Sequence, residues 1–331
     1  MLEKIDLSKI KIRLANINDS ATKSVSFTPS DVTVKLPDSY KFPRLECLEK
    51  PFDKHFQLNP SNNSLMKDRA IFAYDESIQN FNALEGELIF CSSAVIKLDS
   101  TYTFSLSVLP HFITQMKRFK KEKSDGVYYS DNSAKIKNKI VIDAEKRLLV
   151  STVEPNSIVF IDGPLVGRMA TSYMVKMDDA LRAKNCMPIY FVKNSDTRLV
   201  IDDFGLGNNY NSDFHWAATK LPERSRSSFF RYTDQKSQRH SKVFAYVKAL
   251  AGFTERIEMH SLTYEKYKPA IGNLMDLITY MYIVHGDYTN PQVRPIVIAE
   301  KYAREGLRLL NIPILLGRLG FKPTVNQIRF G

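Results

Sequence analysis

The sequence is poor in cysteine: Cys47, Cys91 and Cys186 lie far apart and form no CxxC pair. They provide neither a disulfide framework nor a cysteine-based zinc site, so we expect a reducing, cytoplasmic environment. The six histidines show no HxxxH or HExxH spacing, which argues against a zinc centre of that kind. A GxxxxGKS or GxxxxGKT motif is also absent. Any ATP-driven step through such a phosphate-binding loop would therefore require another polypeptide.

Long hydrophobic runs are missing as well. The most apolar stretch of the second half, residues 274–284, is interrupted by Asp276 and is shorter than the ~20 residues that cross a bilayer. Residues 1–14 alternate charged and apolar side chains and lack the apolar core of a signal peptide. We therefore expect a soluble protein without a membrane partner. The hydrophobic content of 44% and only 13 glycines exclude a disordered or collagen-like chain.

Basic residues are in excess, with 47 Lys and Arg against 36 Asp and Glu and a net charge of +11. This charge favours a polyanionic partner such as nucleic acid, although a merely basic surface would give the same count. The excess is concentrated in residues 116–139 and 220–248, and the second segment also carries aromatic residues that could stack on unpaired bases. The alternative is a solvated loop with its aromatic residues in the core. The candidate DNA contacts are Arg224, Arg226, Arg231, Lys236 and Arg239.

The pattern of the chain predicts an α/β fold. Residues 1–66 show no clean period and are interpreted as an N-terminal extension. Three β-rich runs then predict an antiparallel meander. The runs 157–162 and 187–193 predict buried strands. Residues 199–201 are expected either to extend the second of these strands or to form a strand paired beside it. Helices are expected at 111–122, 141–153, 168–185, 264–284 and 296–310. The result is a mixed sheet of three antiparallel strands followed by parallel strands, flanked by helices, with a helical C-terminal part and a tail at 311–331.

Two aspartates stand where predicted strands end. Asp75 closes the first strand of the meander, and Asp162 closes the apolar run SIVFID, directly before Gly163 and Pro164. Ligands bind at this edge in open α/β sheets. The alternative is that each Asp only caps the following turn.

A third acid, Glu145, lies on the apolar stripe of a predicted helix, where an inward carboxylate requires a partner cation or metal. The alternative is a structural Arg or Lys beside it. If the three acids converge, a divalent cation such as Mn²⁺ or Mg²⁺ would relieve their repulsion and support phosphoryl transfer. Lys193, at the end of the next strand, could hold the scissile phosphate or neutralise an acid. These features suit a metal-dependent nuclease, and other phosphate-transfer enzymes as well.

Several segments resemble the NurA nucleases in order and spacing. They are AIFAYDESI (70–78), IVFIDGPL (158–165), IYFVKNSDTRLV (189–200), FTERIEM (253–259) and RPIVIAEKYA (294–303), which together cover about residues 67–310. The resemblance implies an RNase H-like core and a deoxyribonuclease that uses Mn²⁺ on DNA ends and single strands. It also implies a homodimer that works with a HerA-type hexameric ATPase in DNA end processing or defence against foreign DNA. Asp75, Glu145 and Asp162 match the acids of the family.

The sequence departs from the family at two places. Glu76 replaces the usual Gly after the first Asp and so adds a carboxylate at the centre of the site. This carboxylate is either an extra metal ligand or a sign of altered activity. Glu300 stands where the family often has His, and its carboxylate could still serve as a catalytic metal ligand or base. The family's Tyr corresponds to Tyr288 with a short insertion or, by direct spacing, to Gln292. The alternative function is a non-catalytic DNA-binding subunit with a decayed site, but the intact acid set favours the enzyme. We expect residues 1–66 or 312–321 to help form the dimer or the ATPase contact.

Overall fold

The computed structural model describes residues 45–62, 64–65, 69–98, 102–120, 126–130, 136, 148–166, 171–193, 196–234, 237–285, 291–318 and 320–322. Glu145, Lys236 and Tyr288 lie outside these ranges, so the predictions made for them are not addressed by the structure. Within the described residues no helix is long and apolar enough to cross a membrane.

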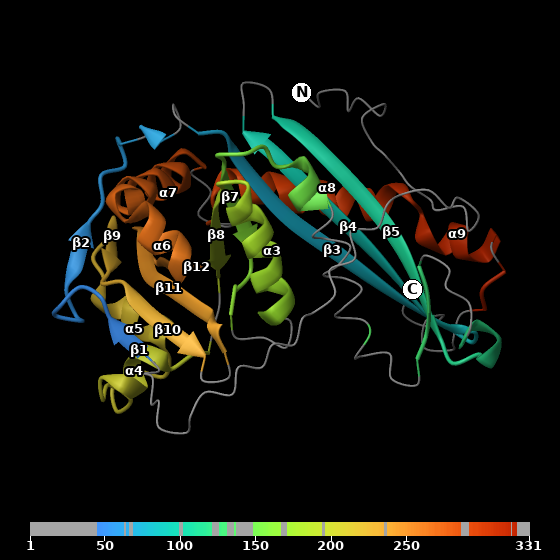
Figure 1. The fold of residues 1–331 in the computed structure, drawn as a ribbon, viewed down its shortest axis with the longest axis horizontal. Helices are drawn as coiled ribbons and strands as arrows, with labels where there is room; N and C mark the ends of the chain where they lie inside the picture. The colour runs from blue at the N-terminus through green and yellow to red at the C-terminus, as the bar shows by residue number, and fades with distance from the viewer. Residues whose placement is uncertain are drawn as a thin grey trace.

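One large mixed sheet organises the described part of the chain (Figure 1). Its main order is β1-β10-β11-β12-β8-β7-β3-β4-β5-β6, and β9 pairs with both β11 and β2. β3, β4 and β5 form the antiparallel meander, while β7 runs parallel to β3, and β8 runs parallel to β7. The strands are β1 (Leu45–Cys47), β2 (His55–Gln57), β3 (Ile71–Ala83), β4 (Gly86–Leu98), β5 (Thr103–Thr114), β6 (Val127–Tyr129), β7 (Ile158–Asp162), β8 (Met187–Val192), β9 (Ser225–Ser227), β10 (Phe230–Asp234), β11 (Ser237–Leu250) and β12 (Phe253–His260).

Helices cover both faces of the sheet. One face packs under α3, and the other packs under α7 and α8, with α8 lying against β3 and β4. In Figure 1, α3 lies in front of β7 and β8, and α8 lies behind the meander. The helices are α3 (Thr171–Ala183), α4 (Leu199–Asp203), α5 (Asp213–Lys220), α6 (Ser261–Tyr267), α7 (Ile271–His285), α8 (Arg294–Leu309) and α9 (Ile312–Arg318), with 3-10 turns η2 (Lys117–Lys120) and η3 (Lys268–Ala270).

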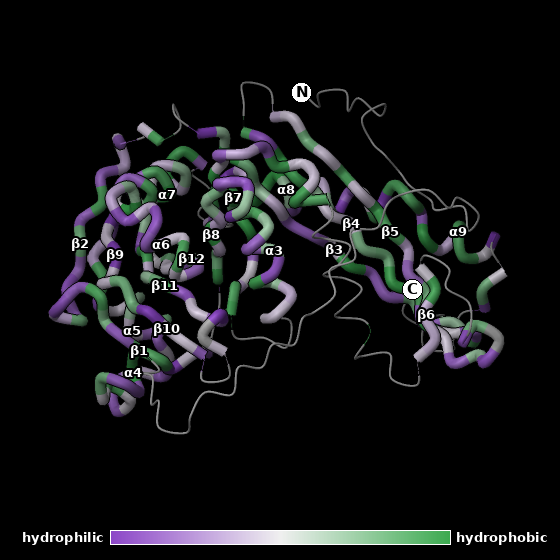
Figure 2. The backbone as a smooth tube through the Cα atoms, viewed as in Figure 1, coloured by the Kyte–Doolittle hydropathy of each residue, from purple (hydrophilic) through white to green (hydrophobic). Residues whose placement is uncertain are grey.

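The central strands form because both of their faces are buried. Every residue of β8 is buried, as are the first four of β7, which matches the unbroken apolar runs expected of parallel strands. Figure 2 shows hydrophobic residues concentrated in these two strands. Alternate residues of β7 pack into the hydrophobic clusters on the two faces of the sheet: Phe160 packs toward α7, whereas Val159 and Ile161 pack toward α3. This alternation fixes which face each charged residue at the strand ends occupies.

Two predicted elements are wrong. No helix spans residues 111–122: β5 continues to Thr114 along β4, and only the short turn η2 follows. His111 and Ile113 lie on the buried side of this strand, so a two-residue period was present inside a segment interpreted as helical. Residues 199–201 belong to helix α4 rather than to a strand, because Asp213 accepts the N–H groups of Val200 and Ile201 at 2.9 and 3.0 Å.

The ends of the described chain are built into the fold. β1 pairs with β10 and β2 pairs with β9, so residues 45–57 of the predicted N-terminal extension belong to the sheet. At the other end, Ile312 and Leu316 of α9 are buried in a cluster with Leu88 and Phe90 of β4. The domain boundaries at residues 66 and 310 stay predictions.

Candidate functional site at the carboxyl edge of the central strands

Four adjacent strands carry charged residues near the carboxyl ends of β7 and β8. The prediction that Asp75 ends its strand is wrong, because β3 continues beside β4 to Ala83. The order β3-β7-β8-β12 brings together Asp75, Asp162, Lys193 and Glu255. The registers Tyr74↔Ile161 and Asp162↔Phe191 place Asp75 level with Asp162. Lys193 and Glu255 lie two residues beyond Phe191, one position past the last β8–β12 pair, Arg256↔Val192. In each strand the buried apolar residues at steps of two belong to the cluster under α7 and α8. The pleat therefore directs all four charged side chains to this same face.

Asp75 and Asp162 lie close enough to influence each other. Asp75 is 8% exposed, and its pKa is raised from 3.8 to about 7, mainly by burial. The charges of Asp162 and Glu76 contribute to this rise, whereas the N–H of Glu76 and the Lys193 ammonium oppose it. The chain turns sharply after Asp162, because Gly163 adopts a φ of 97° and donates its N–H to the Phe191 carbonyl at 2.8 Å. This turn ends β7 at the carboxylate.

Lys193 neutralises Asp162 in the structure. Its Nζ donates to Asp162 Oδ2 at 2.7 Å, and both side chains are about a quarter exposed. The sequence allowed Lys193 either to hold the scissile phosphate or to neutralise an acid, and the structure shows the ion pair with an acid. The contact occupies one of the two carboxylate oxygens of Asp162.

Glu255 is a residue that sequence reasoning missed. It is 1% exposed, and neither carboxylate oxygen has a hydrogen-bond partner. Burial raises its pKa well above the ordinary value, the charge of Asp162 raises it further, and that of Lys193 lowers it. The available signal was the alternation in FTERIEM, which places Glu255 on the same face as Ile257 and Met259. An acid on the apolar face of a strand requires an explanation, because burying an unpaired carboxylate is costly.

Two other predicted ligands do not join this group in the structure. Glu76 follows Asp75 directly on β3 and therefore points to the opposite face, where the Tyr74 hydroxyl donates to it at 3.1 Å. Glu300 lies on α8, on the same side of the sheet as Asp75, and forms an ion pair with Arg304 one turn later. Across the described ranges, no group of three or more His, Cys, Asp or Glu residues is close enough to hold a metal ion.

A buried ion cluster supports the loop after Asp162 from the other face. Glu258 is fully buried and contacts Lys242 Nζ at 2.6 Å and Arg256 Nε at 2.7 Å. The two cations hold the pKa of Glu258 below its usual value, although burial acts against them. Glu258 also accepts the Leu165 N–H at 3.1 Å, and Lys242 donates to the Val166 carbonyl at 3.0 Å. These bonds fix the chain immediately after the strand that carries Asp162.

The predicted DNA-contacting residues differ in accessibility. Arg224 and Arg239 are exposed. Arg226 is 7% exposed, donates to Glu49 at 2.6 and 3.0 Å, and lies over the Phe56 ring. Its guanidinium is therefore committed to the interior. The expected base stacking is wrong for three aromatic residues of this segment, which are fully buried: Phe230, Phe244 and Tyr246.

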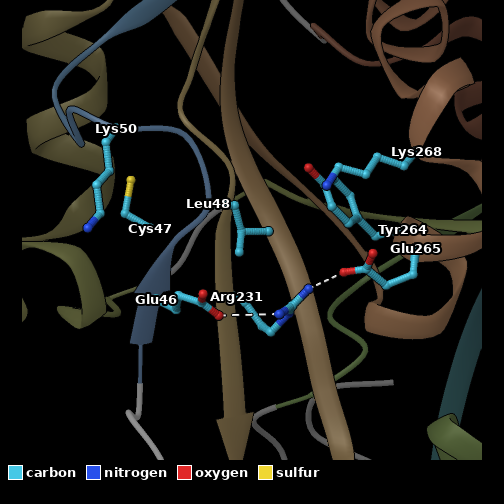
Figure 3. A pocket seen from close by; sticks show the side chains of 8 residues that line it. All are labelled: Glu46, Cys47, Leu48, Lys50, Arg231, Tyr264, Glu265 and Lys268. Atoms are coloured by element: carbon cyan, nitrogen blue, oxygen red, sulfur yellow. Dashed lines mark hydrogen bonds and ion pairs between the residues drawn. The ribbon is translucent and has the colours of Figure 1, made fainter.

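Arg231 lines a pocket of about 560 Å³ at the β1–β10 end of the sheet. Figure 3 shows its guanidinium between two carboxylates, those of Glu46 and Glu265. Lys50 and Lys268 also line the pocket, so its lining carries both signs of charge. A phosphate bound by Arg231 would compete with two carboxylates already in place.

The comparisons with known proteins give a similar fold and no sequence match. No family model matches the chain, and no curated protein matches it either. The NurA nuclease from Sulfolobus solfataricus has a similar structure, with a TM-score of 0.50 and 12% identity over 80% of this chain and 87% of that one. A NurA structure with manganese has a TM-score of 0.40 at 9% identity, covering 76% and 89% of the two chains. An Argonaute from A. aeolicus has a TM-score of 0.36 at 10% identity, covering 71% of this chain and 28% of that one. The likeness to the Sulfolobus protein shows that the described chain has a NurA-like fold.

Proposed function

We propose that this protein is a metal-dependent deoxyribonuclease of the NurA type. The observation that carries the proposal is the position of Asp75 and Asp162, which meet on one face at the carboxyl edge of a sheet with a NurA-like fold. Two carboxylates this close repel each other, and burial adds to the cost of ionising Asp75. A bound cation would remove both penalties. The chemistry of the donors suits a hard cation such as Mn²⁺ or Mg²⁺.

The residues present fit such a cation. Asp75 and Asp162 supply hard oxygen donors, and Glu145 is the further ligand that the sequence proposes. A divalent cation held there would stabilise the negative charge that develops on a phosphodiester during hydrolysis. Lys193, at the same edge, would place a positive charge beside the scissile phosphate.

DNA binding is proposed on the exposed members of the basic segment. Arg224 and Arg239 are free to follow a phosphate backbone, whereas Arg226 is buried in an ion pair. The net charge of +11 supports a polyanionic substrate. A HerA-type ATPase and a second copy of the chain are proposed partners, because the sequence lacks the phosphate-binding loop that would let it drive DNA movement itself.

A non-catalytic DNA-binding subunit is the second candidate. The observation that favours it is the Lys193–Asp162 ion pair, which occupies a proposed metal ligand. The two candidates differ in one measurable property. Only the nuclease cleaves labelled single- and double-stranded DNA with Mn²⁺ or Mg²⁺ and stops when EDTA is added.

Substitution of the two aspartates makes this assay specific. Asp75→Asn and Asp162→Asn should each abolish EDTA-sensitive cleavage while retaining DNA binding, because they remove charge and keep shape. Glu76→Gln is the matched control, since Glu76 neighbours Asp75 in sequence but faces the other side of the sheet. Full activity of either aspartate variant would reject the site, and binding without any cleavage by the native chain would favour the non-catalytic subunit.

A further inference from the structure

We infer that Lys193 exchanges partners, leaving Asp162 for Glu255 when a divalent cation occupies Asp162. The inference rests on the proposed metal site and assigns Glu255 as a positioning residue of that site. Three features of the structure carry it: the present contact of Lys193, the unpaired state of Glu255, and the strand register that brings the two residues together.

The present contact places a positive charge at the site. Lys193 Nζ and Asp162 Oδ2 are 2.7 Å apart, so a cation bound by this carboxylate would meet the charge of the ammonium. A cation at Asp162 would also stand beside a displaced ammonium of the same sign. The ammonium must therefore move away from Asp162 and find another carboxylate or water.

Glu255 is the carboxylate that has no partner. Its side chain is 1% exposed, and both oxygens are buried without a hydrogen bond. The other buried acid of β12, Glu258, is bonded to Lys242 and Arg256. Buried polar groups are normally hydrogen-bonded, so a fully buried carboxyl group whose two oxygens lack a hydrogen bond indicates a site whose partner is elsewhere in this state.

The sheet places Lys193 within reach of Glu255. β12 runs antiparallel to β8 with Arg256 opposite Val192, and one further step places Glu255 opposite Lys193. Side chains at such opposite positions have Cβ atoms about 5 Å apart. Asp162, on the other side of β8, is opposite Phe191 and points to the same face. Lys193 thus lies between two carboxylates and can change partner by rotating its side chain, with the backbone unmoved.

Exchange links cation binding to the position of the lysine. With the cation absent, Lys193 balances Asp162 and limits the repulsion between Asp162 and Asp75. With the cation present, Glu255 holds the ammonium at the edge of the site, where it remains available to a phosphate. Glu255 would then act through Lys193 and would not itself coordinate the cation.

A double-mutant cycle that measures metal binding tests this assignment. Mn²⁺ affinity is measured by calorimetry for the native chain, Glu255→Gln, Lys193→Met and the double variant. Glu255→Gln should weaken Mn²⁺ binding, because the displaced ammonium loses its carboxylate. The expected loss of affinity is about tenfold, the lower end of the range for residues that support a metal ligand. Lys193→Met should tighten binding, and Glu255→Gln should have no further effect in that background. An equal loss in both backgrounds would make Glu255 a ligand, and no loss in the native background would make it irrelevant; either result overturns the inference.

A second cycle needs neither metal nor DNA, so it separates this inference from the proposed function. Asp162→Asn removes the present partner of Lys193, which should then pair with Glu255. We expect Glu255→Gln to leave urea unfolding of the native chain unchanged or improved, and to lower the midpoint in the Asp162→Asn background. Equal effects in the two backgrounds would overturn the exchange even if the protein cleaves DNA. A native chain that binds no Mn²⁺ would instead reject the proposed function together with the cation-driven part of the exchange.

Discussion

The buried carboxylate of Asp75 should make the metal-free protein less stable as pH rises. Its pKa is raised from 3.8 to about 7 in the folded chain. The folded state therefore binds more protons than the unfolded state between these values, and stability falls across this interval. At about 1.4 kcal/mol for each tenfold change in proton affinity, the penalty above pH 7 is at most about 4 kcal/mol.

Asp75→Asn isolates this penalty, because asparagine keeps the shape and carries no charge at any pH. In EDTA, the free energy of urea unfolding of the variant should equal that of the native chain near pH 4 and exceed it by up to about 4 kcal/mol at pH 8. Asp53→Asn, at an exposed position, serves as the control and should show no such trend. A difference between Asp75→Asn and the native chain that stays constant from pH 4 to 8 would refute the reasoning.

Cation binding should reverse the order of the two proteins at pH 8. A ligand that binds only the folded state at a concentration 100 times its Kd adds about 2.7 kcal/mol of stability. The native chain should gain this from Mn²⁺ and Asp75→Asn should gain little, as followed by the midpoint of thermal unfolding. Equal gains in both proteins would place the cation elsewhere.

Three further predictions concern the support of the site, the DNA path and the packing of α8. Glu258→Gln should destabilise the fold by about 3–5 kcal/mol in urea unfolding, because Lys242 and Arg256 would remain buried without their acid; a loss below 1 kcal/mol would contradict this. Arg224→Glu with Arg239→Glu should lower DNA affinity for every sequence alike and reduce its salt dependence in fluorescence anisotropy, which an unchanged salt slope would contradict. Gly306→Ala should lower the unfolding temperature despite the better helix propensity of alanine, because its methyl group would meet the Ser92 hydroxyl of β4; an increase would show that α8 can shift.

The sequence predicted the parts of the fold that depend on uninterrupted local patterns. The run IVFID is apolar on both faces of a strand until Asp162, so the pattern revealed both the buried strand and the residue at its edge. The same reasoning identified the strand that carries Asp75 but ended it there, whereas β3 continues to Ala83 beside β4. It failed at residues 111–122, where Pro110 lies inside β5 and pairs with Phe90. A proline usually marks a break in a strand, and continuation of β5 past it depends on the neighbouring strand β4.

The aromatic residues of the basic segment were misinterpreted for a related reason. Its alternating basic and aromatic residues suit a nucleic-acid surface, but they also suit two paired strands with one face in the core. In the structure, Phe230 and Phe244 are opposite each other on β10 and β11 and are fully buried. Arg226 is neutralised by Glu49, which is 177 positions away in the chain. A count of charges within a segment contains no information about partners supplied by distant residues.

Glu255 shows what the strand order adds to the site. Its position in the sequence gives no connection to Asp162 or Lys193, because β9, β10 and β11 intervene before β12 returns to pair with β8. Once β12 pairs with β8, the alternation of side chains along the strand places Glu255 on the same face as Asp75 and Asp162. The β8–β12 register, extended by one residue, then places Glu255 opposite Lys193. The lysine then has a carboxylate on each side, one bound and one unpaired. With Asp75, the group holds three acids against one ammonium, so a divalent cation is the charge that would balance it when all three acids are ionised.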